Sequence, residues 1–201
     1  SKTKLSMYKT PFHNNTELNK SSFLITGGAG FIGSNIVEYL LKYNAEKVRV
    51  IDNLSTGFIE NVQPYLSNPN FEFIEGDITD FATCIKACEG IDYFLHQAAL
   101  GSVPRSIEDP VATHNSNTNG FLNVMLAARD AKVKRVVYAS SSSVYGDSEQ
   151  LPKVEDSIGK PLSPYAVSKR VGELYAEVFS EVYDMEIIGL TYFNIFGPRQ
   201  N

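Results

Sequence analysis

Residues 22–43 read SFLITGGAGFIGSNIVEYLLKY, and this stretch decides the fold. It opens with a short β-prone run at 23–26, which passes directly into a glycine-rich turn at 27–33. Apolar residues then recur at helical spacing over 34–43. A tight turn between a strand and a helix needs backbone angles that only glycine adopts at low cost. The stretch therefore predicts a strand, a glycine turn and a helix in succession.

The same alternation continues along the chain. Short apolar runs that predict further strands lie at 47–52, 71–74, 91–95, 133–140 and 185–193. Helical periodicity separates them near 80–88, 114–131 and 164–183. Alternating strands and helices form parallel sheets, and nearly continuous apolar strands indicate helices on both faces. The predicted fold class is α/β, a Rossmann-type doubly wound parallel sheet over residues 22–201, preceded by a polar arm at 1–21 with one helical turn.

The composition is that of a globular protein and excludes several classes. Of 201 residues, 43% are hydrophobic and 20% are charged, with 18 Lys and Arg against 23 Asp and Glu for a formal net charge of −5. This mild acidity gives no general attraction to nucleic acid or to an anionic membrane. No apolar run has the length of a bilayer span, the N-terminus lacks the apolar stretch of a signal peptide, and two cysteines make no disulfide framework. We expect a cytoplasmic protein with neither nucleic acid nor membrane as a partner.

The glycine turn has the spacing Gly27-x-x-Gly30-x-x-Gly33. The missing side chains let a pyrophosphate approach the amides at the start of the following helix, where the helix dipole favours negative charge. Asp52 ends the second strand, 19 residues after Gly33. A carboxylate there can accept both ribose hydroxyls of NAD and repels the 2′-phosphate of NADP. We therefore expect NAD as the cofactor, with a purely structural turn and a solvated aspartate as the alternative.

A tyrosine and a lysine lie four residues apart at the start of the last expected helix. Pro164 precedes Tyr165, and Lys169 follows one turn later, so both side chains project from one face. A lysine ammonium beside a phenol favours the phenolate, which can act as a general base on a substrate hydroxyl. The serine run at 140–143 falls at the carboxyl end of the fifth strand, the sheet edge at which open α/β folds bind ligands. Its hydroxyls can hydrogen-bond a reacting oxygen of a bound ligand and relay its proton.

These motifs, in this order, resemble the extended short-chain dehydrogenase/reductase family over nearly all of residues 22–201. The matching segments are 26–33, 52–53, 76–78, 96–99, 140–146, Tyr165 with Lys169, and 192–194. Within that family the chain is most similar to nucleotide-sugar 4-epimerases. Residues 96–106 and the polar arm resemble the branch that acts on UDP-N-acetylated hexosamines, such as UDP-N-acetylglucosamine, and their uronic acids. The resemblance also implies a smaller C-terminal substrate lobe, which we expect to be largely missing from this chain.

The resemblance implies a role for each matching residue. It implies that NAD is bound by Gly27, Gly30, Phe31, Ile32, Asp52, Asn53, Ser55, Thr56, Gly57, Asp77, Ile78, Gln97, Ala98, Ala99, Asn117, Tyr165, Lys169 and Tyr192. It implies that the catalytic groups are Ser141, Ser142, Ser143, Tyr165 as the base and Lys169 as the cofactor anchor. The implied substrate contacts are Gly101, Ser102, Ser141, Ser142, Ser143, Tyr165 and Asn194. No metal site is expected.

The positions just before Val144 indicate which reaction of the family applies. Related sugar 4,6-dehydratases carry Asp-Glu there, and decarboxylating relatives carry a glutamate beside the valine, because each needs a further acid or base. This chain has Ser142 and Ser143. The resemblance therefore implies an NAD-dependent 4-epimerase of a UDP-N-acetylhexosamine or its uronic acid, acting through a 4-keto intermediate in the synthesis of surface polysaccharide precursors. The alternatives are a 4,6-dehydratase or decarboxylase of the family and, from another class, a non-catalytic NAD-binding sensor or scaffold.

Four other features receive structural interpretations. Cys84 and Cys88 lie four apart on an expected helix without further metal ligands at suitable spacing, which favours helix packing. His96 ends a strand beside the cofactor turn, so we expect a structural hydrogen bond there. The interrupted basic group at 129–135 favours a solvated loop. The long helices near 114–131 and 164–183 carry apolar residues on more than one face, and in related enzymes such helices form a four-helix bundle, so we expect a homodimer.

Overall fold

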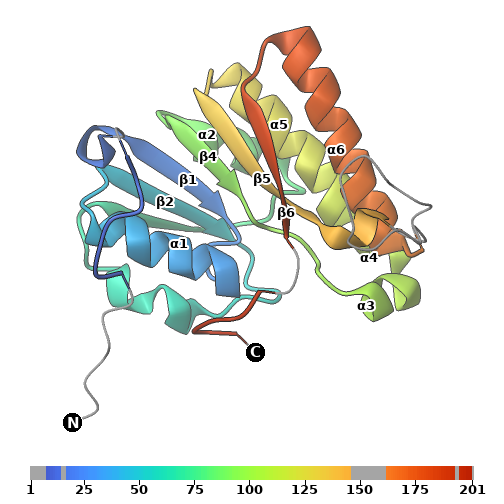
Figure 1. The fold of residues 1–201 in the computed structure, drawn as a ribbon, viewed down its shortest axis with the longest axis horizontal. Coiled ribbons are helices and arrows are strands. Elements are labelled where there is room, and N and C mark those ends of the chain that lie inside the picture. The colour runs from blue at the N-terminus through green and yellow to red at the C-terminus, as the bar shows by residue number, and fades with distance from the viewer. Residues whose placement is uncertain (1–7, 15–16, 146–161, 193–194, 201) are drawn as a thin grey trace.

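The computed structural model describes residues 8–14, 17–145, 162–192 and 195–200. Its centre is a six-stranded sheet with the order β3-β2-β1-β4-β5-β6, in which every pairing is parallel (Figure 1). The strands are β1 (Ser22–Thr26), β2 (Lys47–Asp52), β3 (Phe71–Glu75), β4 (Tyr93–His96), β5 (Arg135–Ser141) and β6 (Ile187–Tyr192). This arrangement confirms the expected doubly wound α/β fold.

Helices cover both faces of this sheet (Figure 1). The longer ones are α1 (Phe31–Lys42), α2 (Phe81–Cys88), α5 (Gly120–Asp130) and α6 (Pro164–Tyr183), and the shorter ones are α3 (Val103–Glu108) and α4 (Pro110–His114). Single turns occur at η1 (Leu18–Lys20), η2 (Ile59–Asn61), η3 (Gln63–Tyr65) and η5 (Ser142–Tyr145), and a π-helical turn occurs at η4 (Asn115–Asn119). Among the described residues, no helix has both the length and the apolar character needed to cross a membrane.

Two hydrophobic cores lie on opposite sides of the sheet, and β1 contributes to both. Leu24 packs into the core that contains α2, α5 and α6, whereas Phe23 and Ile25 pack into the core beside α1. Neighbouring side chains of a strand point to opposite faces, so a central strand covered on both sides is apolar throughout. All five residues of β1 are buried. The strand that carries the glycine turn is therefore held from both faces.

The strand order reverses between β1 and β4, at the centre of the sheet. Thr26 is paired with His96, so the two strands end at the same level. The chain leaves β1 and β4 toward different sides, which opens a crevice at their carboxyl ends. Open α/β sheets bind ligands at this position. The topology thus places the glycine turn where a ligand is expected.

The helical stretch expected near 114–131 is confirmed, and it contains a π-helical turn. α4 ends at His114, η4 follows, and α5 begins only at Gly120; α3 was not expected. The starts of α3 and α4 are capped by Ser102 and Asp109, and each helix has a proline in its first turn. These helices have six and five residues. Such short elements do not show a helical period in the sequence.

The described part of the N-terminal arm packs along α1. The amides of Phe12 and His13 donate to the hydroxyl of Tyr39 at 2.6 and 3.2 Å, and the hydroxyl of Tyr43 donates to the carbonyl of Tyr8 at 2.9 Å. The rings of Tyr8 and Phe12 lie 5.3 and 5.6 Å from that of Tyr39. Aromatic contacts thus attach a largely polar segment to the first helix.

Candidate cofactor and active site

The glycine turn carries the chain from β1 directly to α1. Gly27 has a φ of +69°, its amide donates to the carbonyl of Ile51 at 2.9 Å, and its own carbonyl accepts from the amide of Gly30 at 3.1 Å. A β-carbon on Gly27 would lie 2.9 Å from the backbone of Ala98, and one on Gly33 would lie 2.2 Å from the carbonyl oxygen of Gly27. Only glycine fits these two positions. The turn therefore leaves open the backbone cradle that a pyrophosphate needs at the start of α1.

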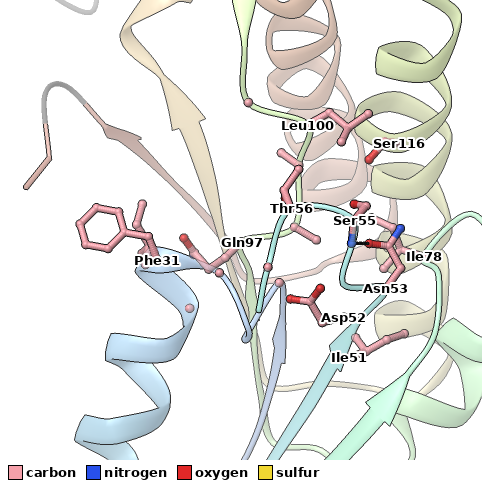
Figure 2. A pocket seen from close by; sticks show the side chains of 18 of the residues that line it. Phe31, Ile51, Asp52, Asn53, Ser55, Thr56, Ile78, Gln97, Leu100 and Ser116 are labelled. Carbon is pink, nitrogen blue, oxygen red and sulfur yellow. Dashed lines mark hydrogen bonds between the residues drawn. The ribbon is translucent and has the colours of Figure 1, made fainter. Parts of the chain in front are cut away.

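A cavity of about 640 Å³ opens at the carboxyl ends of β1, β2, β3 and β4 (Figure 2). This volume lies in the usual range of ligand pockets, about 300–1,000 Å³. Most residues expected to bind NAD line it: Gly27, Gly30, Phe31, Ile32, Asp52, Asn53, Ser55, Thr56, Gly57, Asp77, Ile78, Gln97, Ala98 and Ala99. The fold thus gathers four loops that are distant in the sequence into one site.

Asp52 is buried at the end of β2, and its carboxylate lies in the wall of the cavity (Figure 2). One carboxylate oxygen accepts from the amide of Ala29 at 2.9 Å and the other from the amide of Leu54 at 2.8 Å. Burial raises the pKa of Asp52, and these two hydrogen bonds partly counteract the increase. A carboxylate has about four lone-pair sites, so two remain for ligand hydroxyls. This geometry fits the expected ribose contact.

Asn53 and Asp77 connect the loops that follow β2 and β3. Nδ2 of Asn53 donates to Oδ2 of Asp77 at 3.0 Å, and Thr79 donates to Oδ1 of Asp77 from its amide and its hydroxyl, both at 2.8 Å. Burial raises the pKa of Asp77, but the hydrogen bonds from Thr79 and Asn53 outweigh it and lower the pKa below the usual value. Asp77 is therefore a fixed anion beside Ile78 in the cavity wall.

The loop after β4 forms the opposite wall. The hydroxyl oxygen of Thr26 accepts from the amides of Gln97 and Ala98 at 3.1 and 3.2 Å. The hydroxyl of Tyr192 donates to Oε1 of Gln97 at 3.2 Å, and burial raises the pKa of Tyr192, which keeps it a neutral donor. Tyr192 does not line this cavity, unlike Gln97. Tyr192 therefore orients Gln97, and its expected contact with the cofactor stays a prediction.

Asn117 also lies behind the cavity wall. It is buried in η4, where its side chain accepts from the amide of Leu100 at 2.8 Å and donates to the carbonyl of Leu100 at 3.1 Å. Its amide nitrogen also donates to the hydroxyl of Ser168 on α6 at 3.2 Å. Leu100 lines the cavity whereas Asn117 does not. Asn117 therefore fixes the loop after β4 from within the π-helical turn.

α6 places Tyr165 and Lys169 one turn apart, as expected. Nζ of Lys169 lies 5.9 Å from the ring centre of Tyr165 and donates to the carbonyl of Ala139 at 3.0 Å. Burial lowers the pKa of Lys169 to about 8, with the carboxylate of Glu173 acting in the opposite direction. Lys169 is thus a half-buried cation at neutral pH, close to a phenol. Neither side chain lines the large cavity, and Lys169 borders a void of about 10 Å³ behind Ala98.

The serines at the end of β5 point in different directions. Ser140 is buried, and its hydroxyl donates to Oε1 of Glu173 at 2.7 Å. The hydroxyl oxygen of Ser141 accepts from the hydroxyl and the amide of Ser143 at 3.0 and 3.3 Å, and Ser142 begins η5 between them. Successive residues of a strand face opposite sides, so Ser141 faces away from Glu173. Ser141 and Ser143 form a hydroxyl pair, whereas Ser140 supports α6.

The other expected substrate residues separate in the structure. Gly101 lines the large cavity. Ser102 instead caps α3, where its hydroxyl oxygen accepts from the amide of Arg105 at 3.2 Å. Asn194 lies outside the described residues. Of these three, only Gly101 is seen at the cavity.

Further lining residues were not among those expected to contact cofactor or substrate. Four lie within segments already quoted for the family resemblance: Gly33, Gly76, Leu100 and Arg105. Four others are Ile51, Phe58, Ser116 and Gln200. Ile51 could have been inferred as the neighbour of Asp52 at a buried strand end. Ser116 and Gln200 carry no local signal, because only the packing of η4 and of the segment after β6 brings them to the cavity.

The structural interpretations of the cysteines and of His96 are confirmed. Cys84 and Cys88 are buried in α2, and burial raises the pKa of both thiols to about 12. Within the described part of the chain, no group of three or more His, Cys, Asp or Glu side chains is arranged to hold a metal ion. His96 makes a buried hydrogen bond with Thr26.

Three of the four basic residues at 129–135 pair with neighbouring carboxylates. Arg129 pairs with Asp130 at 2.8 Å and Lys134 pairs with Asp92 at 3.2 Å. Arg135 pairs with Glu186 across the start of β5 and β6. Such pairing fits a solvated loop, as expected.

A parallel sheet whose central crevice combines an open glycine turn at a helix start with a buried carboxylate at the end of the second strand has the features of a dinucleotide-binding domain. Comparison with known proteins narrows this class. The sequence profile of the NAD dependent epimerase/dehydratase family matches residues 23–201, and the chain belongs to that family. Its cofactor is NAD, and the backbone cradle that a β-carbon on Gly27 or Gly33 would fill fits the pyrophosphate of that molecule.

Similar proteins share most of this chain. The UDP-glucose 4-epimerase of Mycolicibacterium smegmatis is 39% identical over 180 residues, which cover 89% of this chain and 57% of the relative. A UDP-N-acetylglucosamine 4-epimerase from Methanobrevibacter ruminantium M1, solved with UDP-N-acetylmuramic acid, is 41% identical with a TM-score of 0.83, covering 90% of this chain and 57% of that one. A dTDP-glucose 4,6-dehydratase from Streptomyces venezuelae, solved with NAD, is 35% identical with a TM-score of 0.84, covering 89% and 57%. The chain thus spans about 57% of the length of these relatives.

Proposed function

We propose that the protein catalyses the NAD-dependent 4-epimerisation of a UDP-N-acetylhexosamine or its uronic acid, in the cytoplasm, as a step toward surface polysaccharide precursors. The observation that carries this proposal is the hydroxyl-only segment of Ser141, Ser142 and Ser143 at the end of β5. The nearby carboxylate of Glu173 accepts a hydrogen bond from Ser140, which faces the other side of the strand, so it does not join this hydroxyl segment. Epimerisation needs a reversible oxidation and no additional acid to expel water or carbon dioxide.

The side chains at the end of β5 and the start of α6 have complementary roles in this reaction. NAD, when bound, supplies reversible hydride transfer at C4 of the sugar. Tyr165 takes the proton of the C4 hydroxyl, and the ammonium of Lys169 stabilises the resulting phenolate. Ser141, oriented by Ser143, donates a hydrogen bond to the same sugar oxygen. After the 4-keto sugar turns over, Tyr165 returns its proton, so the sugar is inverted at C4 and nothing is oxidised overall.

The choice of sugar rests on residues 96–106, which resemble the branch acting on N-acetylated sugars. The structure of the Methanobrevibacter ruminantium M1 protein, a UDP-N-acetylglucosamine 4-epimerase, supports this choice. The UDP-glucose 4-epimerase from Mycolicibacterium smegmatis is of similar identity, so the plain hexose is the competing substrate. These forms differ at C2 and C6 of the sugar.

Dehydration is the competing reaction, because the Streptomyces venezuelae relative is a 4,6-dehydratase. Loss of water needs an acid and a base beyond the tyrosine. Ser142 and Ser143 supply neither. A non-catalytic NAD-binding scaffold is the competing function of another class, and such a protein has no need of the Tyr165–Lys169 pair.

The test supplies UDP-N-acetylglucosamine to the protein, in the longest form that its gene encodes, and follows the sugar by NMR. Formation of the galacto isomer is the expected result, whereas a 4-keto-6-deoxy or decarboxylated product would contradict it. Tyr165→Phe should abolish turnover and still bind NAD, while Tyr175→Phe on the same helix should retain both. A fully active Tyr165→Phe variant would show that another group is the base.

A second copy of the chain is proposed to cover α6. Leu174, Val178 and Val182 recur every fourth residue and are 45%, 51% and 65% exposed. An apolar stripe with this spacing fits a four-helix bundle across a two-fold axis. Sedimentation should show a dimer that Val178→Glu dissociates, and a monomeric wild-type protein at micromolar concentration would contradict this arrangement.

A further inference from the structure

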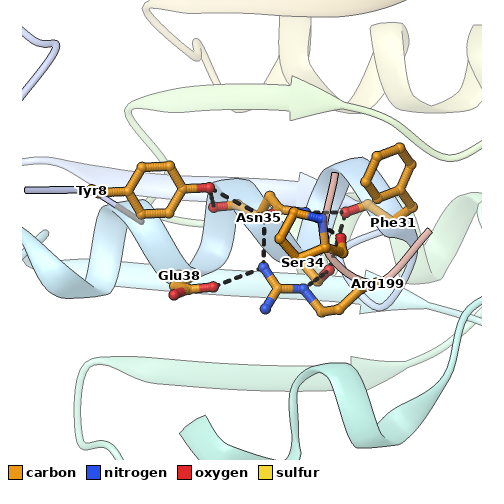
Figure 3. A network of polar contacts seen from close by, with 7 residues as sticks. Tyr8, Phe31, Ser34, Asn35, Glu38 and Arg199 are labelled. Atoms are coloured by element: carbon orange, nitrogen blue, oxygen red, sulfur yellow. Dashed lines mark hydrogen bonds and ion pairs between the residues drawn. The ribbon is translucent and has the colours of Figure 1, made fainter. Parts of the chain in front are cut away.

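Arg199 joins the segment after β6 to the first turns of α1 (Figure 3). Its Nε donates to the hydroxyl of Ser34 at 2.9 Å, and its Nη2 donates to Oδ1 of Asn35 and Oε2 of Glu38, both at 2.7 Å. These partners precede it by more than 160 residues. The planar guanidinium presents several donors in a fixed fork, which a lysine cannot reproduce.

The neighbours of Arg199 are fastened to the same helix. Nδ2 of Asn35 donates to the carbonyl of Pro198 at 3.1 Å, and Gly197 lies next to the ring of Phe31, where a β-carbon would make an ordinary van der Waals contact. Arg199 itself has a φ of +67°, in the left-handed region that non-glycine residues rarely adopt. Such a conformation persists only where surrounding contacts determine it. The contacts to α1 supply that determination for residues 197–200.

This attachment places Gln200 in the wall of the cofactor cavity. The start of α1, to which Arg199 is bound, also contributes Phe31 and Ile32 to that wall. Nε2 of Gln200 donates to the carbonyl of Ile195 at 3.1 Å, and its Oε1 accepts from the amide of Gly197 at 3.4 Å. A primary amide has two N–H donors, so the second one can bind an oxygen of a ligand in the cavity.

We propose that Gln200 is a cofactor-contacting residue and that Arg199 is the positioning residue that holds it, so that residues 197–200 form a strap that is attached to α1 and brings Gln200 to the cavity wall beside the phosphate-binding turn. The inference rests on the NAD site described above. Pyrophosphate oxygens and ribose hydroxyls are the groups that the amide of Gln200 can meet there. A hydrogen bond from Gln200 to the cofactor has to break before the cofactor leaves, so it slows release.

The experiment measures the NAD⁺ dissociation constant by calorimetry and the NADH dissociation rate by stopped-flow fluorescence. One hydrogen bond contributes enough free energy to change either quantity about 3- to 10-fold, and this is the increase expected for Arg199→Ala and for Gln200→Ala. If Arg199 acts through Gln200, then adding Arg199→Ala to Gln200→Ala should cause little further increase in the dissociation constant or the dissociation rate. Arg135→Ala is the matched control, because Arg135 also pairs with a glutamate but lies at the opposite end of β5.

The outcomes separate the strap from the cofactor site itself. Failure of the wild-type protein to bind NAD would contradict the NAD site. If the wild type binds NAD and the Arg199→Ala and Gln200→Ala variants bind and release it equally well, only the proposed strap is overturned. Fully multiplicative effects in the double variant would overturn the positioning role of Arg199. If circular dichroism shows that Arg199→Ala does not fold, Arg199→Lys replaces it. Lysine keeps a cation for Glu38 but lacks the forked donors of the guanidinium, so Arg199→Lys and Gln200→Ala together still test the positioning of Gln200.

Discussion

The hydroxyl of Thr26 lies 2.7 Å from Nδ1 of His96, at paired positions of β1 and β4. The same oxygen accepts the amides of Gln97 and Ala98, so its own proton is directed to Nδ1. His96 is therefore neutral, with its proton on Nε2. Burial, helped by the charge of Lys169, lowers the pKa of His96 to about 3. The pair links the two central strands at the head of the cofactor cavity.

Stability should fall in mild acid because of this histidine. Between pH 6.5 and about 3 the unfolded chain binds a proton on His96 that the folded chain does not, so the free energy of unfolding falls as pH falls, by about 1.4 kcal/mol per pH unit for this group. In urea unfolding, the free energy of unfolding of His96→Gln should fall less steeply with falling pH than that of the wild type, and the difference in slope should be that contribution of His96. His114→Gln, which replaces an exposed histidine, controls for losing a histidine as such. Equal slopes in the wild type and His96→Gln would contradict the buried neutral histidine.

The charge on Lys169 should lower the free energy of unfolding at neutral pH. Its pKa of about 8 lies below the ordinary value of 10.5, so the unfolded chain holds the proton more tightly and the free energy of unfolding rises as pH rises from about 8 to 10.5. That difference in pKa corresponds to at most about 3 kcal/mol. Lys169→Met should therefore be more stable than the wild type at pH 7, with the advantage shrinking above pH 8. Lys86→Met, on the exposed face of α2, should show no such trend, and a destabilised Lys169→Met at pH 7 would refute the expectation.

Two glycines with the same backbone angle separate strain from steric clash. Gly27 and Gly90 have φ values of +69° and +70°, but a β-carbon on Gly90 meets nothing within 4 Å, whereas one on Gly27 lies 2.9 Å from the backbone of Ala98. Gly90→Ala should cost about 1–2 kcal/mol in the free energy of unfolding and leave NAD binding intact. Gly27→Ala should cost more and abolish NAD binding. The free energy of unfolding is measured in urea and NAD binding by calorimetry. Similar losses of stability and of NAD affinity in the two variants would show that the clash with Ala98 is relieved.

Tyr192 should contribute to cofactor affinity without contacting the cofactor cavity. Tyr192→Phe removes the hydroxyl that donates to Gln97 and so frees a side chain of the cavity wall. Loss of one neutral hydrogen bond predicts a rise of about 3-fold in the NAD⁺ dissociation constant. Adding Tyr192→Phe to Gln97→Ala should cause no further loss. A further loss in that double variant would indicate a direct contact between Tyr192 and NAD.

The elements around the glycine turn were predictable because their signals are local. The turn at 27–33, the strand ending at Asp52 and the helix bearing Tyr165 and Lys169 all occur where the pattern of apolar residues placed them. The π-helical turn between α4 and α5 was not predictable. The apolar residues on either side of η4 keep a helical period, and the extra residue of a π turn is visible only from the contacts of Asn117 with Leu100 and Ser168.

The sequence by itself determined the doubly wound fold, the phosphate turn and the identity of the chemical groups, because glycine backbone freedom and side-chain periodicity act between near neighbours. Only the tertiary structure decided which of those groups meet. It turned Ser140 to Glu173 and paired Ser141 with Ser143, moved Tyr192 and Asn117 behind the cavity wall, and brought Gln200 into it. These relationships join residues on different strands and helices. They depend on how β6 and α6 pack against the rest of the sheet, which no local pattern encodes.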